Sequence, residues 1–344
     1  MKKRALVIAP GRGTYNKPEL GYLSRHHSDK AELIAKIDDY RSAKGQTTIS
    51  DLDGRDAYSI KEHTRGDNAS PLIYGCAYAD YLAINRDEYD IVGVTGNSMG
   101  WYIALACAGA LSFDNALDLI NTMGGLMQDS LIGGQLIYPF IDQDWRMQHD
   151  QKQHLLSLIE EINAREDCTL AVSIMLGGML VYGGNQAALG ALKDKLPPLD
   201  DRFPLILPNH AAFHTALQKP IAAKALQIFD ADMFANPTTP LIDGRGHIWR
   251  SHATQASAIF DYTLGHQVYE YYDFTAAVQV SVKEYAPDCL IILGPGTTLG
   301  GAVAQSLIDI NWEGMDSKAA FSARQKSSPY IIAMGIDEQR QLVT

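Results

Sequence analysis

A serine lies between two glycines in the stretch "VTGNSMGWYIAL". The pattern Gly96-x-Ser98-x-Gly100 follows an apolar, β-branched run at 89–96 and precedes a second apolar run. Glycines at these two positions allow a sharp turn from a strand into a helix, and the serine hydroxyl then stands at the helix N-terminus, where backbone N–H groups stabilise an oxyanion. We therefore predict that Ser98 is a nucleophile. The alternative is that Ser98 only caps the helix.

A nucleophilic serine needs a base, and two histidines compete for that role. His214 in "PNHAAFHTALQKP" follows a predicted buried strand and precedes a predicted helix, at a loop position where catalytic residues collect in α/β sheets. His210 lies four residues earlier and is the rival. The pair has the spacing of a helical metal site, but Pro208 and the preceding strand argue against a helix there, so no metal site is predicted.

Predicted strands and helices alternate along most of the chain. The first part is expected to contain a strand at 4–10, a helix at 70–84, a strand at 89–96 and two helices over 98–130. A different order follows, with a strand at 133–141, a helix at 150–164, strands at 169–176 and 179–184, a helix at 185–196 and a strand at 202–209. This second order is that of a ferredoxin-like unit, which we predict to be inserted at 133–204 into an α/β core formed by 1–132 and 205–344.

Composition limits the classes of protein that remain. The chain has 344 residues, of which 46% are hydrophobic and 20% charged, so a large core is expected. The net charge of −11 argues against general nucleic-acid binding. Four widely spaced cysteines without a CxxC pattern indicate reduced thiols and a cytoplasmic protein. No segment is apolar for long enough to suggest a membrane span, and no membrane partner is expected.

Several short motifs together resemble one known family, the malonyl-CoA:acyl-carrier-protein transacylases and the acyltransferase domains of polyketide synthases. The resemblance follows the family order along nearly the whole chain and is weakest over 16–68. The motifs are "PGRGTY" at 10–15, "GNSMGWYIAL" at 96–105, "MGGLMQDS" at 123–130, "FHTALQKP" at 213–220 and "GPGTTL" at 294–299. The resemblance implies an α/β-hydrolase-like large subdomain with a parallel sheet and an inserted ferredoxin-like small subdomain.

The resemblance also assigns roles to the candidate residues. Ser98 matches the nucleophile, and His214 rather than His210 matches the base, because Leu217 and Pro220 follow it at the family spacing. Gln267 matches the residue whose backbone carbonyl orients the histidine. The site is then a serine–histidine dyad.

The resemblance also implies an oxyanion hole, formed by the backbone N–H groups of Arg12 and Met99. Three substrate-binding positions, however, depart from the family pattern. Asn97 replaces a histidine beside the nucleophile. Met123 occupies the position where the family has the arginine that binds the malonyl carboxylate. Met175 begins an apolar "MLGG" where the family has Asn-Ser-Pro-Gly. A buried carboxylate without its partner loses about 3–5 kcal/mol. We therefore expect the enzyme not to be malonyl-specific, unless another cation such as Arg12 compensates.

The expected function is acyl transfer from an acyl-CoA thioester to the phosphopantetheine thiol of an acyl carrier protein, through an acyl-Ser98 intermediate. No permanently bound cofactor is expected, and coenzyme A enters as the thioester substrate. Two alternatives remain. With water as acceptor, the protein would be an acyl-thioester hydrolase with an editing role. Without catalysis, it would be a binder of carrier protein or acyl chains. The changes at Asn97, Met123 and Arg12 favour this alternative, and the presence of Ser98 and His214 argues against it.

Overall fold

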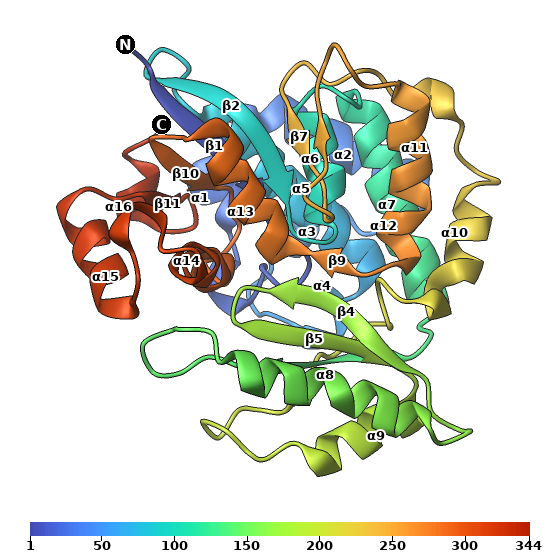
Figure 1. Cartoon of the computed structure of the whole chain (residues 1–344). Coiled ribbons are helices and arrows are strands. Elements are labelled where there is room, and N and C mark those ends of the chain that lie inside the picture. The colour runs from blue at the N-terminus through green and yellow to red at the C-terminus, as the bar shows by residue number, and fades with distance from the viewer.

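The computed structural model describes residues 1–344, which form two β-sheets and the helices around them (Figure 1). The larger sheet has the strand order β11-β10-β1-β2-β7-β8, and only β8 is antiparallel to its neighbour. In chain order its strands are β1 (Lys3–Ala9), β2 (Tyr89–Gly96), β7 (Leu241–Ile242), β8 (Ile248–Trp249), β10 (Cys289–Ile292) and β11 (Ile331–Ala333). The residues from Ala5 to Ala9 are fully buried, as expected for a central parallel strand covered on both faces.

Helices cover both faces of this larger sheet. Helices α6 and α13 both pack on β2, and Figure 1 shows α13 in front of the sheet with α5 and α6 behind it. The helices of this part are α1 (Tyr22–His26), α2 (Ala31–Ala43), α3 (Ile49–Asp53), α4 (Ile60–His63), α5 (Gly66–Ala83), α6 (Gly100–Cys107), α7 (Phe113–Asp129), α10 (Lys219–Ala225), α11 (Ala256–Leu264), α12 (His266–Tyr269), α13 (Phe274–Tyr285), α14 (Leu299–Asp309), α15 (Lys318–Ser327) and α16 (Asp337–Arg340). None of them combines the length and apolar character needed to cross a bilayer.

The smaller sheet lies below the larger one in Figure 1 and has the order β6-β3-β5-β4-β9. Its strands are β3 (Gly134–Pro139), β4 (Leu170–Leu176), β5 (Met179–Gly184), β6 (Leu205–Ile206) and β9 (Tyr272–Asp273). Helices α8 (His149–Asn163) and α9 (Gln186–Lys195) pack on it around a separate hydrophobic core. The first four strands and two helices follow the predicted ferredoxin-like order, so the predicted fold class is confirmed.

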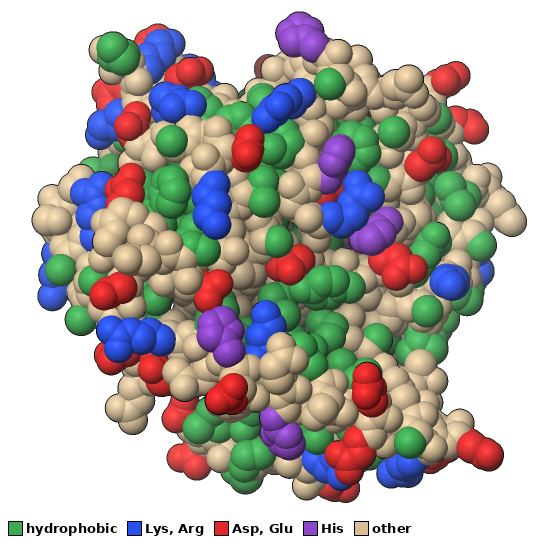
Figure 2. All heavy atoms as spheres, viewed as in Figure 1, with side chains coloured by type: hydrophobic (Ala, Val, Ile, Leu, Met, Phe, Trp, Pro, Cys, Tyr) green, Lys and Arg blue, Asp and Glu red, His purple; other side chains and the backbone are tan.

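Two short strands join the smaller sheet from outside the predicted insertion. Strand β6 begins at Leu205, and β9 adds parallel to β4 from a segment almost one hundred residues away in sequence. The division at 133–204 therefore stays a prediction about folding units, while the sheet itself spans a longer part of the chain. On the face in Figure 2, acidic and basic side chains are interspersed and no single-sign patch covers the surface.

The turn that carries Ser98 depends on the two flanking glycines. A Cβ atom on Gly96 would lie 2.2 Å from the carbonyl oxygen of Gly100, and a Cβ on Gly100 would lie 2.4 Å from the carbonyl oxygen of Ala9. No side chain fits at such distances from backbone atoms. Gly96 and Gly100 therefore allow β2 and α6 to approach each other and β1 closely, which explains the spacing seen in the sequence.

We expect Gly100→Ala to destabilise the protein, because the added methyl group must push α6 away from β1. Overpacking of this kind costs about 1–3 kcal/mol. The matched control is Gly190→Ala in α9, where a Cβ meets nothing within 4 Å and alanine favours the helix by about 0.5–1 kcal/mol. Urea unfolding measures the stability of both variants. Equal unfolding midpoints for the two would contradict this account of the turn.

Candidate active site

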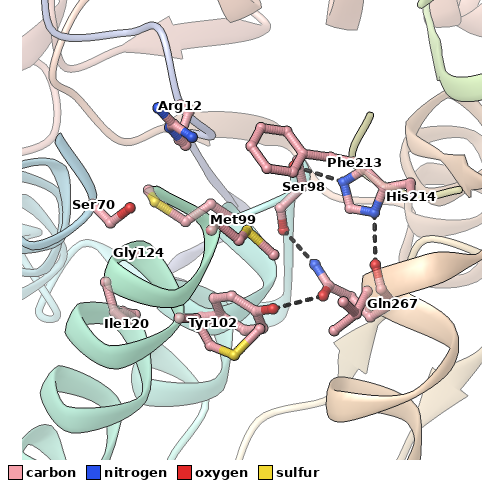
Figure 3. A pocket seen from close by; sticks show the side chains of 13 residues that line it. Arg12, Ser70, Ser98, Met99, Tyr102, Ile120, Gly124, Phe213, His214 and Gln267 are labelled. Atoms are coloured by element: carbon pink, nitrogen blue, oxygen red, sulfur yellow. Dashed lines mark hydrogen bonds between the residues drawn. The ribbon is translucent and has the colours of Figure 1, made fainter. Parts of the chain in front are cut away.

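Ser98, His214 and Gln267 form a hydrogen-bonded chain at the carboxyl end of β2 (Figure 3). Ser98 Oγ lies 2.7 Å from His214 Nε2, and His214 Nδ1 lies 2.6 Å from the backbone oxygen of Gln267. A carbonyl oxygen only accepts, so Nδ1 carries the proton and Nε2 accepts from the serine hydroxyl. This neutral tautomer of His214 is the one that takes a proton from serine. Ser98 itself has φ 55°, a left-handed conformation that is uncommon outside glycine.

The side chain of Gln267 supports the same arrangement. Its Nε2 donates to the backbone oxygen of Ser98 at 3.1 Å, and its Oε1 accepts from the Tyr102 hydroxyl at 2.8 Å. Tyr272 donates to the backbone oxygen of Gly96 on the other side of the turn. Sequence reasoning missed both tyrosines, because a tyrosine in an apolar helix or beside a strand gives no signal that separates it from the core.

Burial lowers the pKa of His214 to about 4, opposed by its hydrogen bond to the Gln267 carbonyl and reinforced by the charge of His266. The imidazole is therefore neutral at physiological pH, as a general base must be. The rival His210 lies near the site but does not contact Ser98. Its Nδ1 is 2.7 Å from Gln135 Oε1, and burial together with the Arg12 charge lowers its pKa to about 3.

The backbone N–H groups of Arg12 and Met99, two residues that line the same pocket as Ser98, stay the predicted oxyanion hole. The amide of Arg12 follows β1, and the amide of Met99 precedes α6. Neither N–H group donates to an acceptor within the chain. Unpaired backbone N–H groups, of which the one at Met99 is at the N-terminus of α6, are suited to a developing negative charge.

A pocket of about 420 Å³, including the open space at its mouth, lies beside Ser98 and His214. Met123 on α7 lines it and is almost fully buried, and its role in substrate binding stays a prediction. Most other lining side chains are apolar; they include Met99, Tyr102, Ile120, Met127, Phe213 and Val268. Arg12 is the single Lys or Arg among the lining residues. Its Nη2 donates to the carbonyls of Thr64 and Asn209, and its guanidinium lies over the Phe213 ring.

Asn97 lies outside this pocket. It lines a second, larger cleft, of about 1140 Å³ including its open mouth, between the two sheets. Arg12 lines both spaces and so stands at their junction. The Asn97 Oδ1 atom is buried and has no hydrogen-bond partner, which leaves an acceptor beside Ser98 for a donor from outside the chain.

The expected place of Met175 in the substrate site needs correction. A β-bulge in β4 shifts the register between Val172 and Ile174, so the alternation of side chains changes there. Met175 consequently packs in the small core under α8 and α9, and Leu176 instead faces the cleft. The sequence showed an apolar strand but not the extra residue that reverses its faces. No group of three or more His, Cys, Asp or Glu side chains is placed to hold a metal ion.

Known proteins resemble this chain in both sequence and structure. No family model matches it. The malonyl CoA-acyl carrier protein transacylase of Salmonella typhimurium is 26% identical over 233 residues, which are 67% of this chain and 71% of that protein. The mycoketide-CoA synthase of Mycobacterium tuberculosis is 25% identical over 256 residues, 66% of this chain and 6% of the synthase.

Solved structures share the fold over the whole length. The acyl-carrier-protein S-malonyltransferase of Burkholderia pseudomallei has a TM-score of 0.74 at 21% identity and covers 99% of both chains. A malonyl-transacylase solved in complex with a type II polyketide acyl-carrier protein has a TM-score of 0.71 at 20% identity, over 99% of this chain and 98% of that one. The fold is thus that of the transacylases. In sequence, the chain is similar to malonyl CoA-acyl carrier protein transacylases and to part of a mycoketide-CoA synthase.

We expect Ser98 to react with a fluorophosphonate probe. The rate of labelling should not change as the pH is lowered through about 6.5, the pKa of an unperturbed histidine. The rate should be lost only toward pH 4, because His214 takes up its proton near that value. Mass spectrometry of the labelled protein measures the rate. His214→Ala should label orders of magnitude more slowly, and His210→Ala at nearly the normal rate.

Circular dichroism must accompany this measurement. His214 takes up a proton near pH 6.5 in the unfolded chain and near pH 4 in the folded chain. Its contribution to the free energy of unfolding is therefore lost as the pH falls from 6.5 to 4. A labelling midpoint near 6.5 in folded protein, or a larger effect of His210→Ala than of His214→Ala, would show that the base has been wrongly assigned.

Proposed function

We propose that this protein transfers an acyl group from an acyl-CoA thioester to the phosphopantetheine thiol of an acyl carrier protein, through an acyl-Ser98 intermediate. The observation that carries this proposal is the chain from Ser98 Oγ through His214 to the Gln267 carbonyl. Relatives named as acyl carrier protein transacylases support the choice of carrier protein as partner. A cytoplasmic location is part of the proposal, supported by four cysteines that are all free and buried.

In the first half of the reaction, His214 Nε2 takes the proton of Ser98 as Oγ attacks the thioester carbonyl. The resulting oxyanion is stabilised by the backbone N–H groups of Arg12 and Met99. When the intermediate collapses, the carbon–sulfur bond breaks and His214 returns the proton to the leaving thiolate. Free coenzyme A departs, and an ester on Ser98 remains.

In the second half, the carrier thiol enters the same position. His214 takes the thiol proton as sulfur attacks the ester carbonyl, and the same N–H groups stabilise the second oxyanion. The carbon–oxygen bond to Ser98 then breaks, and Oγ receives the proton from His214. The backbone carbonyl of Gln267 holds the imidazole in the required tautomer throughout.

The apolar pocket supports an uncharged acyl group rather than malonyl. Met123, Ile120 and Met127 surround the space with hydrocarbon and sulfur, and methionine adapts to hydrocarbon chains. A buried carboxylate without a matched cation costs several kcal/mol. The proposal is therefore that acetyl or a longer uncharged acyl group is preferred.

We expect acyl thioesters to add one acyl mass to the wild-type protein, and Ser98→Ala to acquire none while retaining its fold. Mass spectra before and after the addition of carrier protein test the proposal. An adduct that moves to the carrier protein supports transfer. Rapid loss of the adduct to water would identify a hydrolase instead, and the absence of any adduct would identify a binder.

We expect Met123→Arg to raise the ratio of kcat/KM for malonyl-CoA over acetyl-CoA by about two orders of magnitude, because arginine offers a planar pair of donors to the carboxylate. Met127→Arg on the same helix is the positional control and should change the ratio less, since the family pattern places the arginine at 123. A wild-type ratio that already favours malonyl would contradict the assignment and identify Arg12 as the compensating cation.

A further inference from the structure

Four residues form a buried polar relay between the smaller sheet and the loop that carries His214. His210 Nδ1 lies 2.7 Å from Gln135 Oε1, and Gln135 Nε2 lies 2.6 Å from Ser173 Oγ. Ser173 Oγ in turn lies 2.6 Å from the backbone oxygen of Phe213. Gln135 is on β3 and Ser173 on β4, and both are fully buried. The relay uses none of the groups in the proposed reaction.

The direction of every hydrogen bond in this relay is set by its last member. The Phe213 carbonyl only accepts, so the Ser173 hydroxyl donates to it and accepts from the amide nitrogen of Gln135. The amide oxygen of Gln135 then faces His210 and needs a donor. His210 Nδ1 therefore carries the proton, and its Nε2 is left as an acceptor.

The free Nε2 atom of His210 is open to the cleft between the sheets. It has no partner within the chain, and it is not among the buried atoms that lack one. His210 lines the cleft together with Asn97, the neighbour of the nucleophile, and Arg12. Burial and the Arg12 charge lower the pKa of His210 to about 3, so Nε2 keeps its lone pair at neutral pH. The cleft thus presents Nε2 of His210 as an acceptor, in addition to the unpartnered Oδ1 of Asn97.

We propose that Nε2 of His210 accepts a hydrogen bond from an amide N–H of the pantetheine arm. This contact selects acyl donors and acyl acceptors that carry the arm. The inference rests on the proposed function, in which coenzyme A and the carrier protein share the arm. With its sulfur at Ser98, the arm extends from the pocket into the cleft that Asn97 and His210 line. Its first amide nitrogen is separated from the sulfur by two carbons. His210 is a binding residue here and not the base.

The test compares two thioesters with the same acyl group. Acetyl-CoA has the amide-bearing arm, and S-ethyl thioacetate has none. The quantity measured is the ratio of their second-order rate constants for acylation of Ser98, followed by mass spectrometry. His210→Asn keeps a side-chain donor near the Nδ1 position for Gln135 and removes the Nε2 acceptor. We expect this ratio to fall by about 3- to 10-fold, as one net hydrogen bond predicts.

Two further variants separate binding from positioning. Ser173→Ala leaves both His210 nitrogens in place but removes the hydroxyl that sets the direction of the relay, so the ratio should fall by less than in His210→Asn. His210→Phe keeps a ring and removes both nitrogens, and it should lower the ratio as His210→Asn does. An unchanged ratio in both His210 variants, or an equal loss for the two thioesters, would overturn the inference. Failure of both thioesters to acylate wild-type protein would instead overturn the proposed function.

Discussion

The candidate site depends on how closely the first turn of α6 approaches the end of β1. Gly100 brings α6 to a distance from Ala9 that no side chain permits, and the Asn97 amide donates to the Ala9 carbonyl at 3.1 Å. The two candidate oxyanion donors come from opposite sides of this contact, Arg12 from the loop after β1 and Met99 from the start of α6. One backbone contact therefore sets the relative position of the serine and both donors, and no flexible side chain takes part in it.

His214 is held from both parts of the molecule. On the side of the larger sheet, the Gln267 carbonyl accepts from its ring, and its own amide donates to the Val268 carbonyl at 3.1 Å. On the side of the smaller sheet, Ser173 donates to the carbonyl of Phe213, the preceding residue. A relative shift of the two sheets would disturb these contacts together. The smaller sheet thus contributes to the position of His214, the proposed base, as well as to the cleft wall.

Much of this arrangement could be predicted from the sequence because its signals are local. The two glycines around Ser98 and the strand–helix order of the smaller sheet are local patterns, and the structure has both. Features that depend on distant pairing could not be predicted. Strand β9 has two residues and no strand pattern of its own, and the bulge that turns Met175 into the small core is visible only in the pairing with β5. The relay through Gln135 likewise joins segments that nothing in the sequence connects.

Arg12 and Met123 have opposite effects on the binding of a charged acyl group. Which effect is larger depends on the free energies of the two interactions. Burial lowers the pKa of Arg12 only to about 10, opposed by Asp67, so the guanidinium remains charged at neutral pH. Its Nη2 is already used by two carbonyls, and its Nε is buried without a partner. A carboxylate that reached Nε would gain about 1.5–3 kcal/mol from that charged hydrogen bond. Removing the same carboxylate from water costs several kcal/mol, and the wall at Met123 offers no second donor. A guanidinium whose Nη2 is already occupied is a weaker partner for a carboxylate than a free arginine fork, and this is why we propose an uncharged acyl group as the preferred substrate.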